Sequence, residues 1–251
     1  MLTSAHLRLW LSMGLALVAL LSASPAAASE DGPLEPENEG VEELPVRDGP
    51  TSLLVAHAGM LGLPIAESCP FEGAPCEPGE LAIDLGVGAL GRIGDFAFGG
   101  GVSVGFGLRT TEAAGEPVFE RQQRRSYFTF EGLFRYYLPP VRTFEWWVGA
   151  SAGVVVVDDR WTALADRQPI VDADLVGPDA LSISTEGGLV GLALGGTWMF
   201  SEIFFIGTEL KYSNWVLPRR RQVSPLGDLA SLAGRIDVVA LHIVTGFELP
   251  I

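Results

Sequence analysis

Beyond its first 28 residues, the chain lacks any apolar run that could form a membrane-spanning helix. Such a helix needs about 20 predominantly apolar residues. Every apolar run after Ala28 is interrupted at short intervals by glycine or by a charged residue. If the protein is embedded in a membrane, we therefore expect it to cross as a closed sheet, because lipid offers no partners for unpaired backbone groups.

Positive charge is also scarce, with 16 Lys and Arg against 31 Asp and Glu. The formal charge of -15 divides into +1 in residues 1–28, -7 in residues 29–50 and -9 in the remainder. This balance excludes a nucleic-acid partner, because such proteins need basic surfaces to neutralise phosphates.

Two segments precede the part of the chain with regular patterning. Residues 1–28 have the features of a cleaved signal peptide: Arg8, an apolar core from Leu9 to Leu21, and three alanines before Ser29. No cysteine follows that site directly, which argues against a lipoprotein anchor. Residues 29–50 are rich in Glu, Pro and Gly, and predict an acidic, disordered periplasmic segment.

Cysteine occurs only twice, as Cys69 and Cys76 in the stretch CPFEGAPC. A metal or redox site is disfavoured, because the spacing is not C-x-x-C and no histidine lies nearby. In an exported protein, the pair predicts a structural disulfide, since the intervening Pro and Gly favour a turn.

The stretch from Asp95 to Leu108 (DFAFGGGVSVGFGL) indicates the fold. Large apolar residues alternate with Gly, Ala and Ser at a period of two, which is typical of a β-strand. A half-buried strand of a soluble protein would place charged or polar residues on its second face, yet this parity carries no charge. The apolar face therefore more plausibly meets lipid, as in a transmembrane barrel.

Eight strands with this alternation are predicted in residues 51–251. They lie near 51–62, 80–91, 95–109, 125–138, 143–158, 182–200, 202–215 and 235–250. Long and tight connections alternate between them, which predicts an all-β, eight-stranded, antiparallel up-and-down transmembrane barrel with both termini in the periplasm. In the sixth strand, Glu186 shares the parity of Val190, so either Gly187 and Gly188 form a bulge or Glu186 lies above the bilayer.

Aromatic residues near the tight turns predict a girdle at the periplasmic interface of the membrane. They are Phe96, Tyr136, Phe144, Trp146, Trp198 and Phe200, and Trp161 and Trp215 are candidates for the outer interface.

This pattern resembles the small eight-stranded outer-membrane barrels, the family of the OmpA membrane domain and OmpX with related porin-like proteins. The similarity covers residues 51–251 and includes the ending Leu241, Ile243, Thr245, Phe247, Leu249, Ile251. That ending is similar to the signal read by the barrel assembly machinery, although Ile251 replaces the family's terminal Phe or Trp. The resemblance implies a protein of the Gram-negative outer membrane, which we expect to be a monomer.

Charged residues on the inward parity predict a network in the lumen. The set is Asp84, Glu131, Arg135, Glu145, Glu209, Lys211, His242 and Glu248. Because an eight-stranded barrel is only wide enough for side chains or one small ligand, we expect a wet, discontinuous cavity crossed by salt bridges. The main hypothesis is a non-enzymatic barrel that stabilises the envelope or presents loops, without a cofactor or metal, and a small passive pore is an alternative.

A lipid-modifying barrel enzyme, either a deacylase or an acyltransferase, is the other alternative. It would need a nucleophile within reach of a base. His57 and His242 lie on the first and last strands, which become neighbours on closure, and Ser103, Ser151 and Ser213 share the inward parity. No serine stands beside His242, whereas barrel deacylases of this fold carry a His, Ser and Glu group, so a hydrogen-bonded histidine at the closure seam is the favoured interpretation.

Two basic clusters fall in predicted outer loops. Arg121, Arg124 and Arg125 form one, and Arg219, Arg220 and Arg221 form the other. Because guanidinium groups suit phosphate, we hypothesise contact with lipopolysaccharide in addition to outer-membrane lipid; the alternative is that both clusters are solvated loops.

Overall fold

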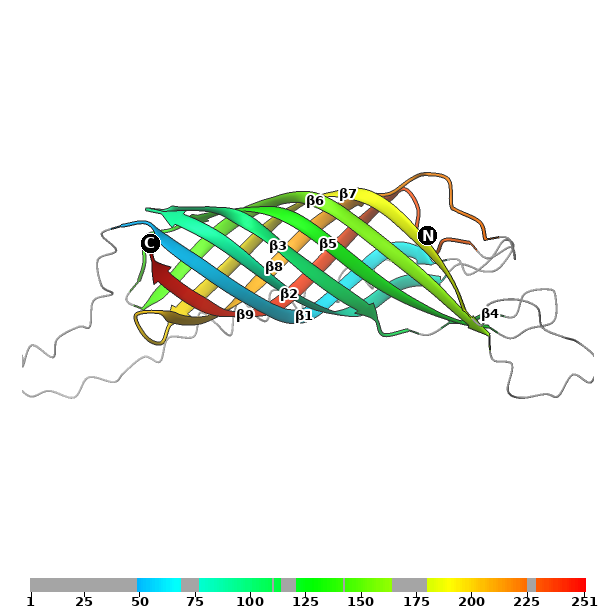
Figure 1. Ribbon diagram of the computed structural model, residues 1–251, viewed down its shortest axis with the longest axis horizontal. Coiled ribbons are helices and arrows are strands. Elements are labelled where there is room, and N and C mark those ends of the chain that lie inside the picture. Colours follow the sequence, from blue (N-terminus) through cyan, green and yellow to red (C-terminus); the bar gives the residue numbers. More distant parts are fainter. Residues whose placement is uncertain are drawn as a thin grey trace, which may run out of the picture. The chain divides into compact units, whose positions relative to one another are not determined.

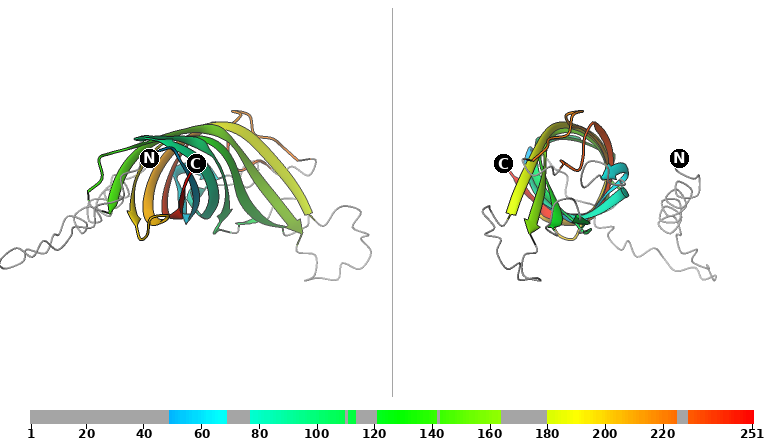
Figure 2. Two further views of the ribbon diagram at one scale, coloured as in Figure 1. Left: turned by 60° about the vertical axis from the view of Figure 1, so that its left-hand side comes forward. Right: turned by 90° about the vertical axis from the view of Figure 1, so that its right-hand side faces the viewer.

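A computed structural model describes residues 49–68, 77–109, 111–113, 121–141, 143–163, 180–224 and 229–251. Its main feature is a closed barrel of eight long antiparallel strands, seen from the side in Figure 1 and end-on in Figure 2. The long strands are β1 (Thr51–Ser68), β2 (Glu77–Ile93), β3 (Phe96–Gly107), β5 (Arg121–Tyr137), β6 (Phe144–Ala163), β7 (Ala180–Met199), β8 (Phe204–Val216) and β9 (Arg235–Pro250). A three-residue strand, β4 (Thr111–Ala113), extends the sheet beside β5. The predicted fold is confirmed.

Each long strand pairs with its neighbour in sequence, and the sheet closes where β1 pairs with β9. The β3–β5 pairing passes over the short β4, so the ring is continuous. In the described residues, no helix is long and apolar enough to cross a membrane.

The two ends of the barrel differ in the length of their connections. At the turn end, β2 and β3 are joined through Gly94, whose φ of 58° suits glycine, and two further short connections follow Tyr137 and Met199. The backbone N–H of Ile251 also donates to the carbonyl of Pro50 there, at 3.1 Å. The longer connections all lie at the opposite, loop end. The predicted alternation of connections is therefore confirmed.

The outer surface of the barrel is apolar through its middle and toward the turn end. Its exposed residues include Phe98, Phe130, Val190, Leu192 and Ile243. Toward the loop end the outward positions become polar, with Arg124, Arg160 and Ser182 on adjacent strands. This distribution matches a lipid-facing belt bordered by water.

Aromatic rings form neighbouring pairs at the turn end of the belt. The pairs are Phe96 with Tyr136, Phe144 with Trp146, and Trp198 with Phe200, with ring centroids 5.2, 4.9 and 6.0 Å apart. The proposal that Trp161 and Trp215 mark the outer interface is wrong, because both are 1% exposed and face the interior. Their parity places them on the inner face.

Glu186 lies on the outward face of β7 without a bulge. The pairing of β6 with β7 runs in unbroken register, with Glu186 opposite Val156. Glu186 is exposed and stands two positions from Ser184, whose hydroxyl donates to Asp158 at 2.9 Å. The bulge is excluded, and the polar setting agrees with a position beyond the apolar belt.

Inside the barrel, two apolar clusters flank a polar middle. The cluster toward the turn end includes Leu53, Leu90, Tyr137, Trp147 and Phe205. The cluster toward the loop end includes Leu63, Tyr127, Trp215, Leu217 and Leu232. Some inward glycines accommodate the large rings: a Cβ on Gly195 would lie 2.3 Å from the Trp147 ring. At this position the space beside the glycine is filled by an aromatic ring.

Several predictions fall outside the described residues. They are the signal peptide of residues 1–28, nearly all of the acidic segment 29–50, and the bridge between Cys69 and Cys76. The last described residues on either side of the cysteine segment, Ser68 and Glu77, are register partners in the β1–β2 hairpin. The disulfide stays a prediction.

Candidate functional site in the barrel interior

Three side chains converge at the seam where the barrel closes. Gly59 of β1 lies opposite Asp84 of β2 on one side and His242 of β9 on the other. His57 stands two positions before Gly59, on the same inward face. The register therefore brings two imidazoles and one carboxylate together from three adjacent strands.

The two histidines share the carboxylate of Asp84. Asp84 Oδ2 lies 2.9 Å from His242 Nε2 and 3.7 Å from His57 Nε2. The two imidazole ring centroids are 4.6 Å apart. Asp84 and His242 are buried, and His57 retains partial exposure toward the interior.

Missing side chains on β1 and β2 make room for this group. A Cβ on Gly86, opposite His57 in the register, would lie 2.4 Å from the His57 ring. A Cβ on Gly59 would lie 2.8 Å from Cδ2 of His242. The His57 imidazole thus occupies the space of a side chain at Gly86, whereas a Cβ on Gly59 would also collide with the backbone carbonyl of Leu241.

Glu209 of β8 connects His242 to Arg135. Its Oε1 lies 3.4 Å from His242 Nδ1, and its Oε2 accepts a hydrogen bond of 3.1 Å from Arg135 Nη2. The Arg135 guanidinium also lies over the Trp147 ring, 4.0 Å from its centroid. Arg135 Nη1 has no hydrogen-bond partner among the described residues, although Arg135 is buried.

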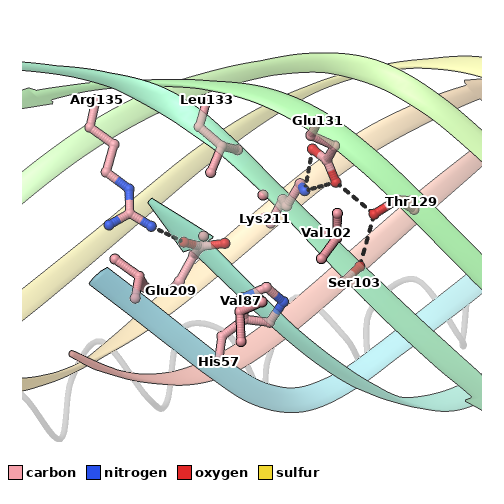
Figure 3. A pocket seen from close by; sticks show the side chains of 13 residues that line it. His57, Val87, Val102, Ser103, Thr129, Glu131, Leu133, Arg135, Glu209 and Lys211 are labelled. Carbon is pink, nitrogen blue, oxygen red and sulfur yellow. Dashed lines mark hydrogen bonds and ion pairs between the residues drawn. The ribbon is translucent and has the colours of Figure 1, made fainter. Parts of the chain in front are cut away.

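A second ion pair crosses the middle of the lumen. Lys211 Nζ donates to both carboxylate oxygens of Glu131 at 2.6 Å. Glu131 also accepts from the Thr129 hydroxyl, which in turn shares a hydrogen bond with Ser103. These contacts are visible in Figure 3.

A small cavity, of about 40 Å³, separates the two groups of side chains. His57, Arg135, Glu209, Glu131 and Lys211 line it together with apolar residues of β1, β2 and β3, as Figure 3 shows. The cavity is polar enough to hold water, because several of its walls carry charged groups.

Near the loop end, Arg125 forms a separate buried network. It is paired with Glu80 and with Asp159, and Glu80 also accepts a hydrogen bond of 2.7 Å from the Tyr127 hydroxyl. The backbone N–H and the hydroxyl of Ser231 both donate to Asp159, at 2.9 and 2.8 Å. Ser231 belongs to the connection between β8 and β9, so part of this connection folds back into the mouth of the barrel.

At the turn end, Arg92 holds two glutamates. It donates two hydrogen bonds to Glu145, at 3.0 and 3.1 Å, and lies 3.8 Å from Glu248. The Thr51 hydroxyl donates to Glu248 at 2.7 Å, and the Arg92 guanidinium lies 3.9 Å from the centroid of the Tyr137 ring. This network closes the end that carries both termini of the barrel.

The structure places all eight residues of the predicted lumen set in the interior, where they form three separate groups of interacting side chains. Asp84, His242, Glu209 and Arg135 are linked, and Glu131 pairs with Lys211, whereas Glu145 and Glu248 lie at the turn end with Arg92. Sequence reasoning missed Arg92, Glu80, Arg125 and Asp159 as lumen residues. Glu80 and Arg125 already lie within the predicted strands on the inward parity, and Arg92 and Asp159 lie one residue beyond the predicted strands 80–91 and 143–158, so parity could have revealed all four.

The six arginines proposed to contact lipopolysaccharide differ in their exposure. The prediction is wrong for Arg125, which lies in β5, is 7% exposed and points inward. Arg124 is exposed on the outer face of β5, and Arg219 and Arg220 are exposed after β8 with Arg221 half-buried. Arg121 is the first residue of β5, and its side chain lies outside the description.

Among the residues that the structure describes, no hydrogen bond joins Ser103, Ser151 or Ser213 to His57 or His242. Both nitrogens of His242 face carboxylates, while Ser103 shares its hydrogen bond with Thr129. Ser151 Oγ is buried and has no partner among the described residues.

No protein-family model matches the chain. No curated protein matches it either. Three solved structures with a similar arrangement are Neisserial surface protein A, the outer membrane protein OprG of Pseudomonas aeruginosa and the outer membrane protease OmpT of Escherichia coli. Their identities are 10%, 11% and 7%, with TM-scores of 0.48, 0.38 and 0.38. The alignments cover 81%, 81% and 82% of this chain, and 100%, 98% and 98% of those chains.

This chain has the fold of the small eight-stranded outer-membrane barrels. At such low identities the likeness concerns the fold alone.

Proposed function

We propose that the protein is a monomeric, non-enzymatic barrel of the Gram-negative outer membrane that presents its loops and does not conduct. The observation that carries this proposal is how side chains fill the interior. Apolar clusters lie toward both ends, and charged networks bind side chains across the lumen between and beside them. An open pore would need a continuous polar path instead.

The proposal places the turn end in the periplasm and the loop end at the cell surface. Short connections on one side and long connections on the other are typical of outer-membrane barrels, whose short turns face the periplasm. The described ends of the barrel, at Pro50 and Ile251, would then both be periplasmic, and the aromatic pairs would lie at the inner interface of the membrane.

Contact with lipopolysaccharide phosphates is part of this proposal. Arg124 of β5 and Arg160 of β6 are direct register partners, and both are exposed on the outer face near the loop end. No ion pair links either one to a carboxylate within the described part of the chain. Like charges directly opposite each other destabilise a sheet, so an anion between the two guanidinium groups would be favourable.

Location and conductance test the first part of the proposal. The full-length protein should fractionate with outer membranes, and its gel mobility in detergent should change on heating. In planar bilayers the purified protein should give no large, steady conductance. Recovery as a soluble periplasmic monomer would contradict the membrane assignment, and a steady conductance would assign passive transport instead.

A binding measurement tests the lipopolysaccharide contact. Replacing both Arg124 and Arg160 by alanine should weaken binding of lipopolysaccharide to the detergent-solubilised protein on the order of tenfold or more, because hydrogen bonds to charged groups contribute about 1.5–3 kcal/mol. Gln122→Ala, on the same outward face of β5, is the matched control and should bind as the unmodified protein does. Equal binding by the double variant, or equal binding of dephosphorylated lipopolysaccharide, would show that the phosphates are not recognised here.

A further inference from the structure

We infer that His57, Asp84 and His242 form a binding site for a divalent transition-metal ion of the zinc class at the closure seam of the barrel. Each residue offers one ligand atom, and these atoms all lie within 4.8 Å of one another. Two imidazole nitrogens and one carboxylate oxygen are a donor set that zinc takes in proteins, with a fourth position left for water.

The donor spacing fits a single ion. Bonds of about 2.0–2.2 Å from zinc to nitrogen and oxygen place two ligand atoms of a tetrahedral site roughly 3.2–3.6 Å apart. Asp84 Oδ2 is 2.9 Å from His242 Nε2 and 3.7 Å from His57 Nε2, so the observed separations lie on either side of that range. The two imidazole nitrogens lie no more than 4.8 Å apart, so a single ion would draw the two rings together by roughly 1 Å at most.

A carboxylate stands behind one of the histidines. Metal-bound histidines usually donate their other ring N–H to a carboxylate or a carbonyl, which fixes the tautomer and the ring orientation. His242 Nδ1 faces Glu209 Oε1 at 3.4 Å, and Glu209 is itself held by Arg135. With Nδ1–H directed to Glu209, the lone pair of Nε2 is free to bind the ion beside Asp84.

The backbone around the site is rigid and shaped for the imidazoles. All three ligands are on strands rather than loops, and Gly59 and Gly86 supply the space that the rings occupy. His57 also lines the small cavity in the lumen, which is the side from which a water molecule would fill the fourth coordination position.

Charge in the middle of the lumen favours a cation. With both histidines neutral, Asp84, Glu131 and Glu209 carry three negative charges against the two positive charges of Arg135 and Lys211. Buried charge without compensation is costly. Either a proton or a metal ion could supply the missing charge, and only the metal requires both histidines to be unprotonated.

A bound ion would link β1, β2 and β9, and so would bridge the seam at which the first and last strands of the barrel pair. Since the three ligands come together only in the closed barrel, binding would favour the folded state. We therefore infer that the ion stabilises the closed barrel. This role is independent of the lipopolysaccharide contact.

Zinc titration of the full-length protein in detergent, after treatment with EDTA, tests the inference. We expect one Zn²⁺ per chain and a higher midpoint of thermal unfolding with Zn²⁺ than with EDTA. His57→Phe keeps a ring of similar size but removes a ligand, and it should weaken Zn²⁺ binding on the order of 100-fold. Asp84→Asn should act in the same direction. Ser103→Ala, which alters the same cavity outside the donor set, should bind as the unmodified protein does.

Cobalt substitution gives a readout that needs no variant. Co²⁺ added to the unmodified, EDTA-treated protein should produce visible absorption bands of a low-coordinate nitrogen and oxygen site, and Zn²⁺ should abolish them. The absence of Zn²⁺ uptake, the absence of these bands, or equal Zn²⁺ affinity in His57→Phe and Ser103→Ala would each overturn the inference and leave a proton-bridged network.

Discussion

Two ion pairs inside this barrel cross the lumen and do not link neighbouring strands. Arg135 of β5 reaches Glu209 of β8, and Lys211 of β8 reaches Glu131 of β5. Arg135 also lies over Trp147, so one side chain joins the charged middle to the apolar cluster at the turn end. Removing one partner of such a pair is more costly than the pair is stabilising, because a buried charge remains without compensation.

Arg135→Ala should therefore destabilise the barrel by about 3–5 kcal/mol. The substitution leaves Glu209 without its guanidinium partner and removes the contact with Trp147. Urea unfolding in detergent, followed by heat-dependent gel mobility, measures the loss. Arg124→Ala is the control, because Arg124 is exposed on the outer face of the barrel, next in sequence to the inward-facing Arg125. It should change the free energy of unfolding by less than about 1 kcal/mol. Equal losses in the two variants would contradict this account.

At the scale of elements, part of the connection between β8 and β9 folds into the barrel interior at the loop end. Ala230, Ser231 and Leu232 are at most 2% exposed, and Leu232 belongs to the apolar cluster at this end. Ser231 is bound to Asp159, and its hydroxyl also accepts a hydrogen bond of 2.6 Å from Arg125 Nε. The strands β5 and β6 thus position a segment that lies more than 60 residues later in the chain.

Ser231→Asp should release this segment from the barrel mouth. The new carboxylate would stand beside that of Asp159, and like charges in a buried site repel strongly. Hydrogen exchange of the amides of residues 230–232 should become faster, while exchange in the middle of β6 and β7 stays unchanged. Ser182→Asp, at an exposed position on β7, should leave residues 230–232 protected. Unchanged exchange in Ser231→Asp would show that Asp159 does not hold the segment.

For the whole molecule, the apolar belt determines whether the barrel is more stable in water or in a lipid bilayer. Leu192, with 66% of its surface exposed, lies on the outward face of β7 within the belt, and Ser182 lies on the same face near the loop end. In water such a surface would promote association, whereas in a bilayer it replaces contacts among lipid chains.

Leu192→Arg should lower the free energy of unfolding in phospholipid vesicles by about 2–4 kcal/mol, because it places a cation in the middle of the hydrocarbon layer. Ser182→Arg should cost only about 0–1 kcal/mol, because it adds the same charge near the interface. Reversible denaturant unfolding of the two variants in the same vesicles compares them. Similar values would mean that the belt does not match the bilayer as described.

Much of this fold follows from the sequence because alternation at a period of two is a local property. It identified eight strands, their inward and outward faces, and the alternation of long and short connections. It also placed His57 and His242 on strands that meet at closure, with Asp84, Glu209 and Arg135 on the inner face.

Tertiary structure alone decided which of these residues meet. Contacts across the lumen depend on the stagger between strands, which parity does not encode, so Asp84 with the two histidines and Arg92 with Glu145 emerge only in the closed barrel. Most strands also extend further toward the loop end than the apolar pattern suggests, because strand pairing continues beyond the lipid belt. Arg125 and Trp215 lie near this end and face the interior. Finally, Ser231 reaches Asp159 through an irregular connection, for which no periodic pattern exists.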